Sequence, residues 1–94
     1  MAGKIMPRQS DKEYLAGLVF VKRLPNGEMV TRPQVLEAKY RDSLSPELVG
    51  EVLSIHARTL KDAKRRFIET LPYHRELMGE GRIRVKTGGR TLFL

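Results

Sequence analysis

The longest periodic stretch of the chain is residues 45–72, SPELVGEVLSIHARTLKDAKRRFIETLP. Ser45 is a favoured helix cap, Pro46 suits the first helical turn, and Glu47 favours the positive end of the helix dipole. Six side chains then recur at alternating steps of four and three residues, which places them on one stripe: Val49, Leu53, His56, Leu60, Ala63 and Phe67. The spacing predicts one long central helix over about residues 46–71.

A second interpretation divides the same stretch into two helices. The segment Thr59-Leu-Lys-Asp62 could cap a new helix and would create a turn after Ala57. We favour the single helix because the stripe continues in phase through Thr59. Its heptad-like spacing would also serve as a seam between two copies, so the pattern is compatible with a homodimer.

Toward the N-terminus the sequence predicts a β-hairpin over about residues 18–31. Residues 18–24 are rich in β-branched and aromatic side chains, which favour strands. Pro25-Asn-Gly27 follows with residues that favour a tight turn, and residues 28–31 return as the second strand.

Short helices are predicted around this hairpin and after the central helix. Ser10-Asp-Lys-Glu13 matches a capping box whose helix would stop at Gly17, and a second helix is expected over Pro33–Asp42. A third is expected over Tyr73–Met78. Residues 1–9 lack periodicity and are expected to form a flexible N-terminal arm.

The C-terminal residues 82–94 predict a second hairpin. Residues 82–86, RIRVK, alternate between charged and apolar side chains, and Thr87-Gly-Gly89 suits a turn before a final strand over residues 91–94. Ile83 and Val85 should therefore face the core.

Length and composition limit the expected architecture to one small domain, residues 10–94. The chain has 94 residues, and the predicted fold class is α+β, with two hairpins, about 18–31 and 82–94, and the long helix 46–71 between short helices. Cysteine is absent, which excludes a disulfide framework, a thiol nucleophile and any cysteine-based metal site. The N-terminus lacks the apolar core of a signal peptide, and the apolar run Leu15–Val21 is too short to span a bilayer, so we expect a cytoplasmic protein.

The charge balance indicates a polyanionic partner. There are 18 Lys and Arg residues against 11 Asp and Glu, a formal net charge of +7. Residues 82–90 contain four basic side chains and no acidic one, so the predicted hairpin would present a cationic ridge able to contact phosphates. Its members are Arg82, Arg84, Lys86 and Arg90. The alternative is a half-exposed strand whose basic face protects an edge from aggregation.

A second basic cluster lies in the predicted central helix. Arg58, Lys61 and Arg65 fall on one flank, but acidic residues four positions away could neutralise much of this charge. Lys61 and Lys64 are the least compensated. We therefore add Lys61, Lys64 and Arg65 to the candidate contacts.

Catalytic, metal and stacking sites are weakly indicated. His56 lies on the apolar stripe without a second ligand at helical spacing, so a metal site is not expected, and no cofactor motif is present. Tyr73-His-Arg-Glu76 could perform acid–base chemistry on RNA, although successive helical residues point in different directions. Phe20, Phe93 and the three tyrosines do not interleave with cations in the sequence as in a single-strand stacking platform.

Three functions are compatible with these patterns. The favoured one is a non-enzymatic protein that binds DNA or RNA through phosphate contacts of the C-terminal hairpin. The second is an adaptor or inhibitor, of the kind that mobile elements and phages encode, whose basic face docks on an acidic protein surface. The third is a small toxin-type ribonuclease that would use His74 and its neighbours.

Overall fold

The chain folds around one mixed β-sheet. The computed structural model describes residues 11–73, 82–88 and 91–94. Within them, five strands form a sheet with the order β3-β1-β2-β4-β5, in which β2 and β4 are parallel and the other neighbours are antiparallel. The elements are β1 (Lys12–Arg23), β2 (Met29–Glu37), the 3-10 helix η1 (Ala38–Ser43), β3 (Leu48–Ala57), the α-helix α1 (Leu60–Thr70), β4 (Ile83–Lys86) and β5 (Thr91–Phe93).

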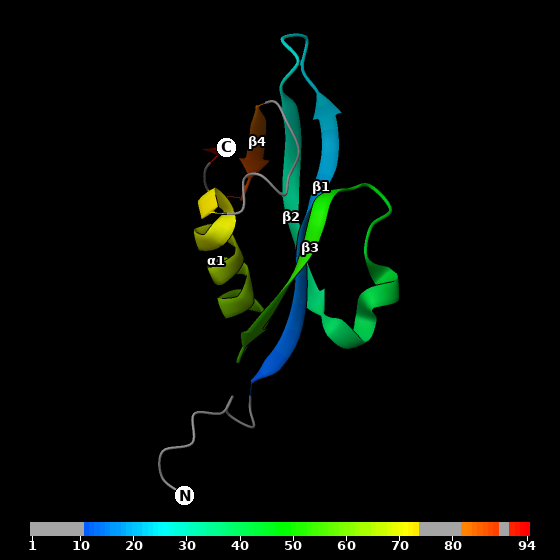
Figure 1. Ribbon diagram of the computed structural model, residues 1–94, viewed down its shortest axis with the longest axis vertical. Coiled ribbons are helices and arrows are strands. Elements are labelled where there is room, and N and C mark those ends of the chain that lie inside the picture. The colour runs from blue at the N-terminus through cyan, green and yellow to red at the C-terminus, as the bar shows by residue number, and fades with distance from the viewer. Residues whose placement is uncertain (1–10, 74–81, 89–90) are drawn as a thin grey trace, which may run out of the picture.

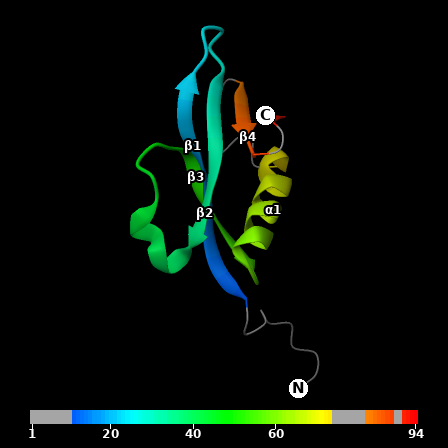
Figure 2. The same ribbon diagram turned by 180° about the vertical axis from the view of Figure 1, so that it is seen from behind.

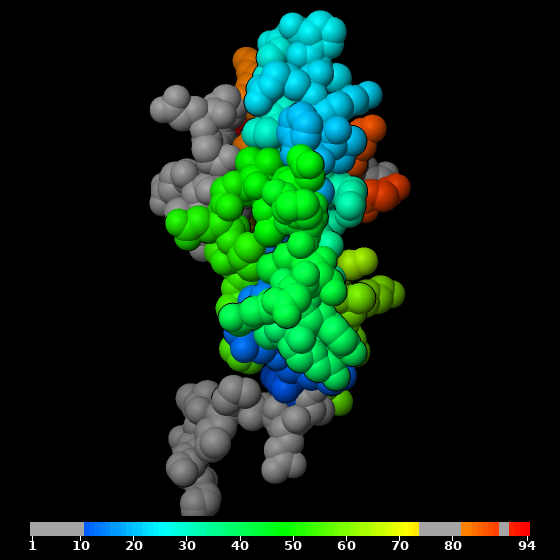
Figure 3. All heavy atoms as spheres, turned by 90° about the vertical axis from the view of Figure 1, so that its right-hand side faces the viewer, coloured from blue at the N-terminus to red at the C-terminus, as the bar shows by residue number. Residues whose placement is uncertain are grey.

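The sheet separates two covering segments. The helix α1 packs against one face, while η1 and the connection that follows it lie on the opposite side (Figures 1 and 2). The space-filling view shows this connection spread over the middle of the sheet (Figure 3). Apolar residues of β1 are therefore buried on both faces, which explains why this strand has a continuous apolar run.

Strands β1 and β2 form an antiparallel hairpin at the first predicted position, with longer strands than predicted. Their pairing extends from Tyr14 opposite Glu37 to Arg23 opposite Met29, interrupted by one bulge. The turn closes where the Gly27 N–H donates to the Leu24 carbonyl at 2.9 Å, and the Gly27 φ of 91° explains the glycine there.

The two short helices predicted around this hairpin are absent from the described residues. Residues 12–17 belong to β1, and Pro33 lies inside β2, which runs to Glu37 before the short 3-10 helix η1 begins. Gly17 does not end a helix. A Cβ atom at Gly17 would lie only 2.9 Å from Leu48 Cδ2, so glycine leaves room for this side chain of the neighbouring strand β3.

The predicted long helix is wrong, and with it the predicted fold class. Residues 48–57 form β3, which pairs with β1, and only residues 60–70 are α-helical. The alternative of two helices is also wrong for residues 48–57, but its cap is present: Thr59 accepts a hydrogen bond from the Asp62 backbone N–H at 3.1 Å at the start of α1. Pairing with β1 decides the outcome, since Leu53 and Ile55 on alternate positions of β3 pack against the core.

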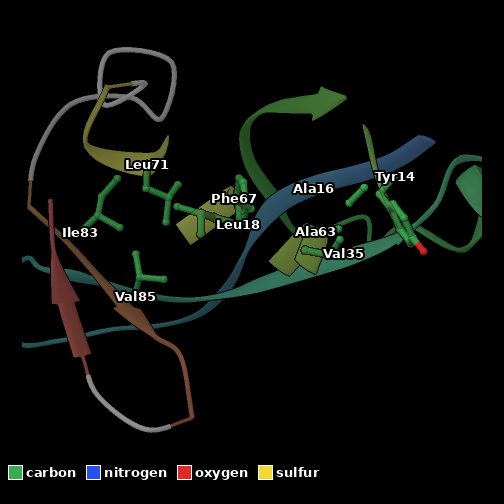
Figure 4. Packing of buried hydrophobic residues seen from close by; sticks show 10 residues of the cluster. Tyr14, Ala16, Leu18, Val35, Ala63, Phe67, Leu71, Ile83 and Val85 are labelled. Carbon is green, nitrogen blue, oxygen red and sulfur yellow. The ribbon is translucent and has the colours of Figure 1, made fainter. Parts of the chain in front are cut away.

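The core lies between α1 and the sheet and continues to β4. Phe67, at its centre, is fully buried beside Leu18 (Figure 4). Ile83 and Val85 are also fully buried, which confirms the prediction that they face the core. The cluster comprises Tyr14, Ala16, Leu18, Val35, Ala57, Ala63, Phe67, Leu71, Ile83 and Val85.

The C-terminal strands join the sheet through a short parallel contact. Residues 29–31 of β2 pair with residues 83–85 of β4, and Thr31 Oγ1 donates to the Arg84 carbonyl at 3.0 Å. β4 and β5 then pair antiparallel, with Arg84 opposite Phe93 and Lys86 opposite Thr91, at the second predicted hairpin.

Some predictions concern residues that the structure does not describe. The N-terminal arm of residues 1–9 lies outside the described residues, as do five of the six residues of the helix predicted over Tyr73–Met78.

Among the helices in the described ranges, none has both the length and the apolar character that a bilayer crossing needs.

Candidate polyanion-binding surface

A cationic hollow forms where β4 ends beside β2 and α1. Thr31 is the last residue of β2 that pairs with β4, but β2 continues to Glu37. Beyond Thr31 the edge of β2 that faces β4 is therefore not paired with it. In Figures 1 and 2 the arrow of β4 runs down beside β2 and ends near α1. The hollow has a volume of about 340 Å³, and its lining residues are Arg32, Pro33, Lys64, Arg65, Ile68, Lys86 and Thr87.

Four of these lining residues are cationic, and the described lining includes no carboxylate. Arg32 comes from β2, Lys64 and Arg65 from α1, and Lys86 from the end of β4. Pro33 and Ile68 supply the apolar part of the wall. Cations that converge on a concave surface reinforce one another's potential, which raises the local concentration of an anionic ligand.

Most of the cations that line the hollow are not engaged in ion pairs with the described residues. Within the described ranges of the chain, no ion pair joins Arg32, Lys64 or Lys86. Arg65 differs, because its guanidinium lies 3.7 Å from Asp62 and 3.6 Å from Glu69 along α1. These are exposed pairs that water screens, so they orient the Arg65 side chain more than they cancel its charge.

The structure thus brings together three of the residues that the sequence singled out. The sequence placed Lys64 and Arg65 in the basic cluster of the predicted central helix and Lys86 in the C-terminal hairpin. In the structure all three line the same hollow. Arg32 was missed, because it lies between the predicted strand that ends at residue 31 and the predicted helix that begins at Pro33. No local pattern in the sequence marks it, since only the parallel pairing of β2 with β4 brings it near Lys86.

Arg84 has a different environment from the other cations of β4. Its guanidinium donates to both carboxylate oxygens of Glu28, with Nη2 at 3.0 Å from Oε1 and Nε at 3.3 Å from Oε2. The Asn26 amide also donates to Glu28 Oε1, at 2.6 Å. The hydrogen bonds from Arg84, and to a smaller extent the one from Asn26, lower the pKa of the Glu28 carboxyl below its ordinary value. Arg84 is therefore largely neutralised by an acid from the first hairpin.

The remaining predicted contacts are dispersed. Arg82 is exposed and lines a second hollow of about 370 Å³ with Glu28, Arg84 and Phe93. Lys61 is exposed on the first turn of α1 and does not line the cationic hollow. Arg90 lies outside the described residues.

Most of the residues considered for catalysis lie outside the described residues. Tyr73 is 82% exposed, and the other three residues of its tetrad, 74–76, lie outside the described residues. His56 is exposed on β3, where its carbonyl accepts a hydrogen bond from Arg66 at 2.7 Å. The described residues contain no group of three or more His, Cys, Asp or Glu side chains placed to hold a metal ion.

Comparisons with models of known protein families, with curated proteins and with solved structures find no match to this chain.

Proposed function

We propose that the protein is a non-enzymatic nucleic-acid-binding protein that contacts phosphates through the cationic hollow. The observation that carries this proposal is the convergence of four cations from three elements, with no carboxylate among the described lining residues. Lysine and arginine side chains that neutralise phosphates release condensed counterions, which gives affinity without base recognition.

The convergence also argues against the two simpler explanations for the basic residues. A solvated helix face would account for Lys64 and Arg65 alone, and a protected strand end would account for Lys86 alone. Neither explains why Arg32, more than fifty positions before Lys86, is placed at the same hollow. A concave site for an anion accounts for all four.

The test is a salt titration with matched double variants. Fluorescence anisotropy of a labelled mixed-sequence oligonucleotide should show an affinity that falls steeply with salt. In the variant K64Q/K86Q the affinity should drop and the logarithmic salt slope should decrease by about 1.4 to 1.8, because two phosphate contacts are lost. The control K12Q/K39Q removes the same charge from exposed lysines that lie 3.8 Å from Glu37, and it should bind nearly as the wild type does.

Two results would contradict the proposal. Equal losses in K64Q/K86Q and K12Q/K39Q would mean that net charge, and not the hollow, determines binding. An absence of binding to any polynucleotide at low salt would exclude this function and leave the docking of the basic surface on an acidic protein as the alternative.

A further inference from the structure

Phe93 is an exposed aromatic ring in a cationic setting that the linear sequence does not reveal. The side chain is 65% exposed on β5, whereas Phe67 is fully buried. Phe93 lies opposite Arg84 in the β4–β5 pairing, and the Arg84 guanidinium carbon is 5.1 Å from the centre of the ring. An aromatic ring and a cation that are nine positions apart in the chain are therefore neighbours on the sheet.

The ring is held in position by a chain of contacts. Arg84 cannot move freely, because Glu28 binds its guanidinium at two nitrogen atoms and Asn26 holds Glu28. The guanidinium supports the ring through a cation–π contact. Arg84 is thus a positioning residue for Phe93, and because Glu28 neutralises its charge we expect it to contribute little to phosphate binding.

A second cation, Arg82, lies beside the ring. Arg82 lines the same hollow as Phe93, and no ion pair joins it to any of the described residues. Lys86, four positions after Arg82 in the chain, lines the cationic hollow. At the usual rise of a β-strand the Cα atoms of Arg82 and Lys86 are about 13 Å apart, so the two hollows lie near opposite ends of β4.

We propose, resting on the proposed function, that the ligand is single-stranded nucleic acid, which runs along β4 and stacks a base on Phe93 between phosphate contacts at Arg82 and at the cationic hollow. Unpaired bases expose a π face to an aromatic side chain, whereas bases in a duplex are already stacked and out of reach. The combination of a cationic path and an exposed ring is the chemistry by which single strands are bound without base readout. DNA and RNA share this chemistry.

The first test compares single-stranded with duplex ligands, in the wild type and in a variant without the ring. Anisotropy competition should rank an oligothymidylate or oligouridylate of about 12 nucleotides above a duplex of equal charge. The variant Phe93→Leu keeps an apolar side chain but removes the ring, and it should weaken single-strand binding about 10-fold while leaving duplex binding unchanged. Tyr73→Leu, which alters an aromatic residue that is 82% exposed elsewhere, is the matched control and should have little effect.

The second test reports stacking directly. The chain contains three tyrosines but no tryptophan, so Phe93→Trp introduces a single tryptophan at an exposed position, which can be excited selectively. Its emission should be quenched on addition of the single strand, with an affinity close to that of the wild type, and Tyr73→Trp should be quenched much less. Separate titrations with the DNA and RNA oligonucleotides distinguish the two ligand sources.

The outcomes separate this inference from the function on which it rests. Salt-dependent binding that is lost in K64Q/K86Q, with equal affinity for duplex and no quenching in Phe93→Trp, would overturn the single-strand proposal and retain phosphate binding. Failure to bind any oligonucleotide would overturn both. Preference for single strands together with selective quenching would support both.

Discussion

Glu28 determines which cations of the C-terminal strands stay available. It is 7% exposed, and it takes up the Arg84 guanidinium through two hydrogen bonds. Arg82 and Lys86, on either side of Arg84, remain exposed. A charge count over residues 82–90 treats the three arginines and the lysine alike, because Glu28 is more than fifty residues away in the sequence. Only the folded chain shows that one of them is already paired.

Glu28 should also make stability depend on acid pH. Its pKa is lowered in the folded protein, chiefly by the hydrogen bond from Arg84, so the ionised carboxylate stabilises the fold above the unfolded-state pKa of about 4.3. This contribution is lost as the pH falls through the lower, folded-state pKa. We expect Glu28→Gln to have a lower Tm than the wild type at pH 7, and the difference to shrink as the pH falls below about 4.

Thermal melts followed by circular dichroism from pH 7 to pH 3 measure this difference. Glu37→Gln is the control, since Glu37 contacts its two lysines only at 3.8 Å and the lysine side chains are largely exposed. Its melting curve should follow the wild type at every pH. A Tm difference between wild type and Glu28→Gln that stays constant from pH 7 to pH 3 would contradict the assigned role of the Glu28 carboxylate.

At the scale of elements, features that depend on neighbouring residues could be predicted from the sequence, whereas features that depend on pairing between distant segments could not. The Pro25-Asn-Gly27 turn and the inward-facing Ile83 and Val85 follow from local rules and are present. The β3 segment misleads, because its apolar residues fit a helical stripe and a strand equally well over so short a window. The sequence did contain one signal against a continuous helix, the glycine at position 50. In the structure Gly50 has a φ of 75°, which a helix does not allow. Pairing with β1 supplies the energy that decides for a strand, and no local window contains it.

The cap at Thr59 marks the boundary between β3 and α1, and its removal should be measurable. Thr59→Ala leaves the Asp62 backbone N–H without its side-chain acceptor and should lower the free energy of unfolding by about 1 kcal/mol. Thr59→Ser and Thr59→Asn retain an acceptor and should restore most of this loss. Urea unfolding at equilibrium provides the measurement. Equal stability of Thr59→Ala and Thr59→Ser would show that α1 begins without help from this side chain.

At the scale of the whole molecule, the candidate site is a product of long-range topology. Parallel pairing of residues 29–31 with residues 83–85 places Lys86 near Arg32. Packing of α1 on the sheet places Lys64 and Arg65 at the same hollow. The sequence indicated that a basic surface exists and named three of these four residues. It could not indicate that they form one hollow, because the pairing partners are more than fifty residues apart. The cross-strand contact of Arg84 with Phe93 was hidden for the same reason, at shorter range.

The net charge of +7 should give stability and binding opposite responses to salt. Added salt screens the repulsion among the cations of the hollow and should raise the Tm, whereas the same salt weakens a ligand held by counterion release. K64Q/K86Q relieves this repulsion, so at low salt it should be more stable than the wild type by about 0.5 kcal/mol, a few degrees in Tm, although it binds less tightly. K12Q/K39Q leaves Glu37 without its lysines, and its Tm should stay the same or fall. A lower Tm in K64Q/K86Q than in the wild type would mean that these lysines stabilise the fold. Their gathering at one hollow would then need no ligand to explain it.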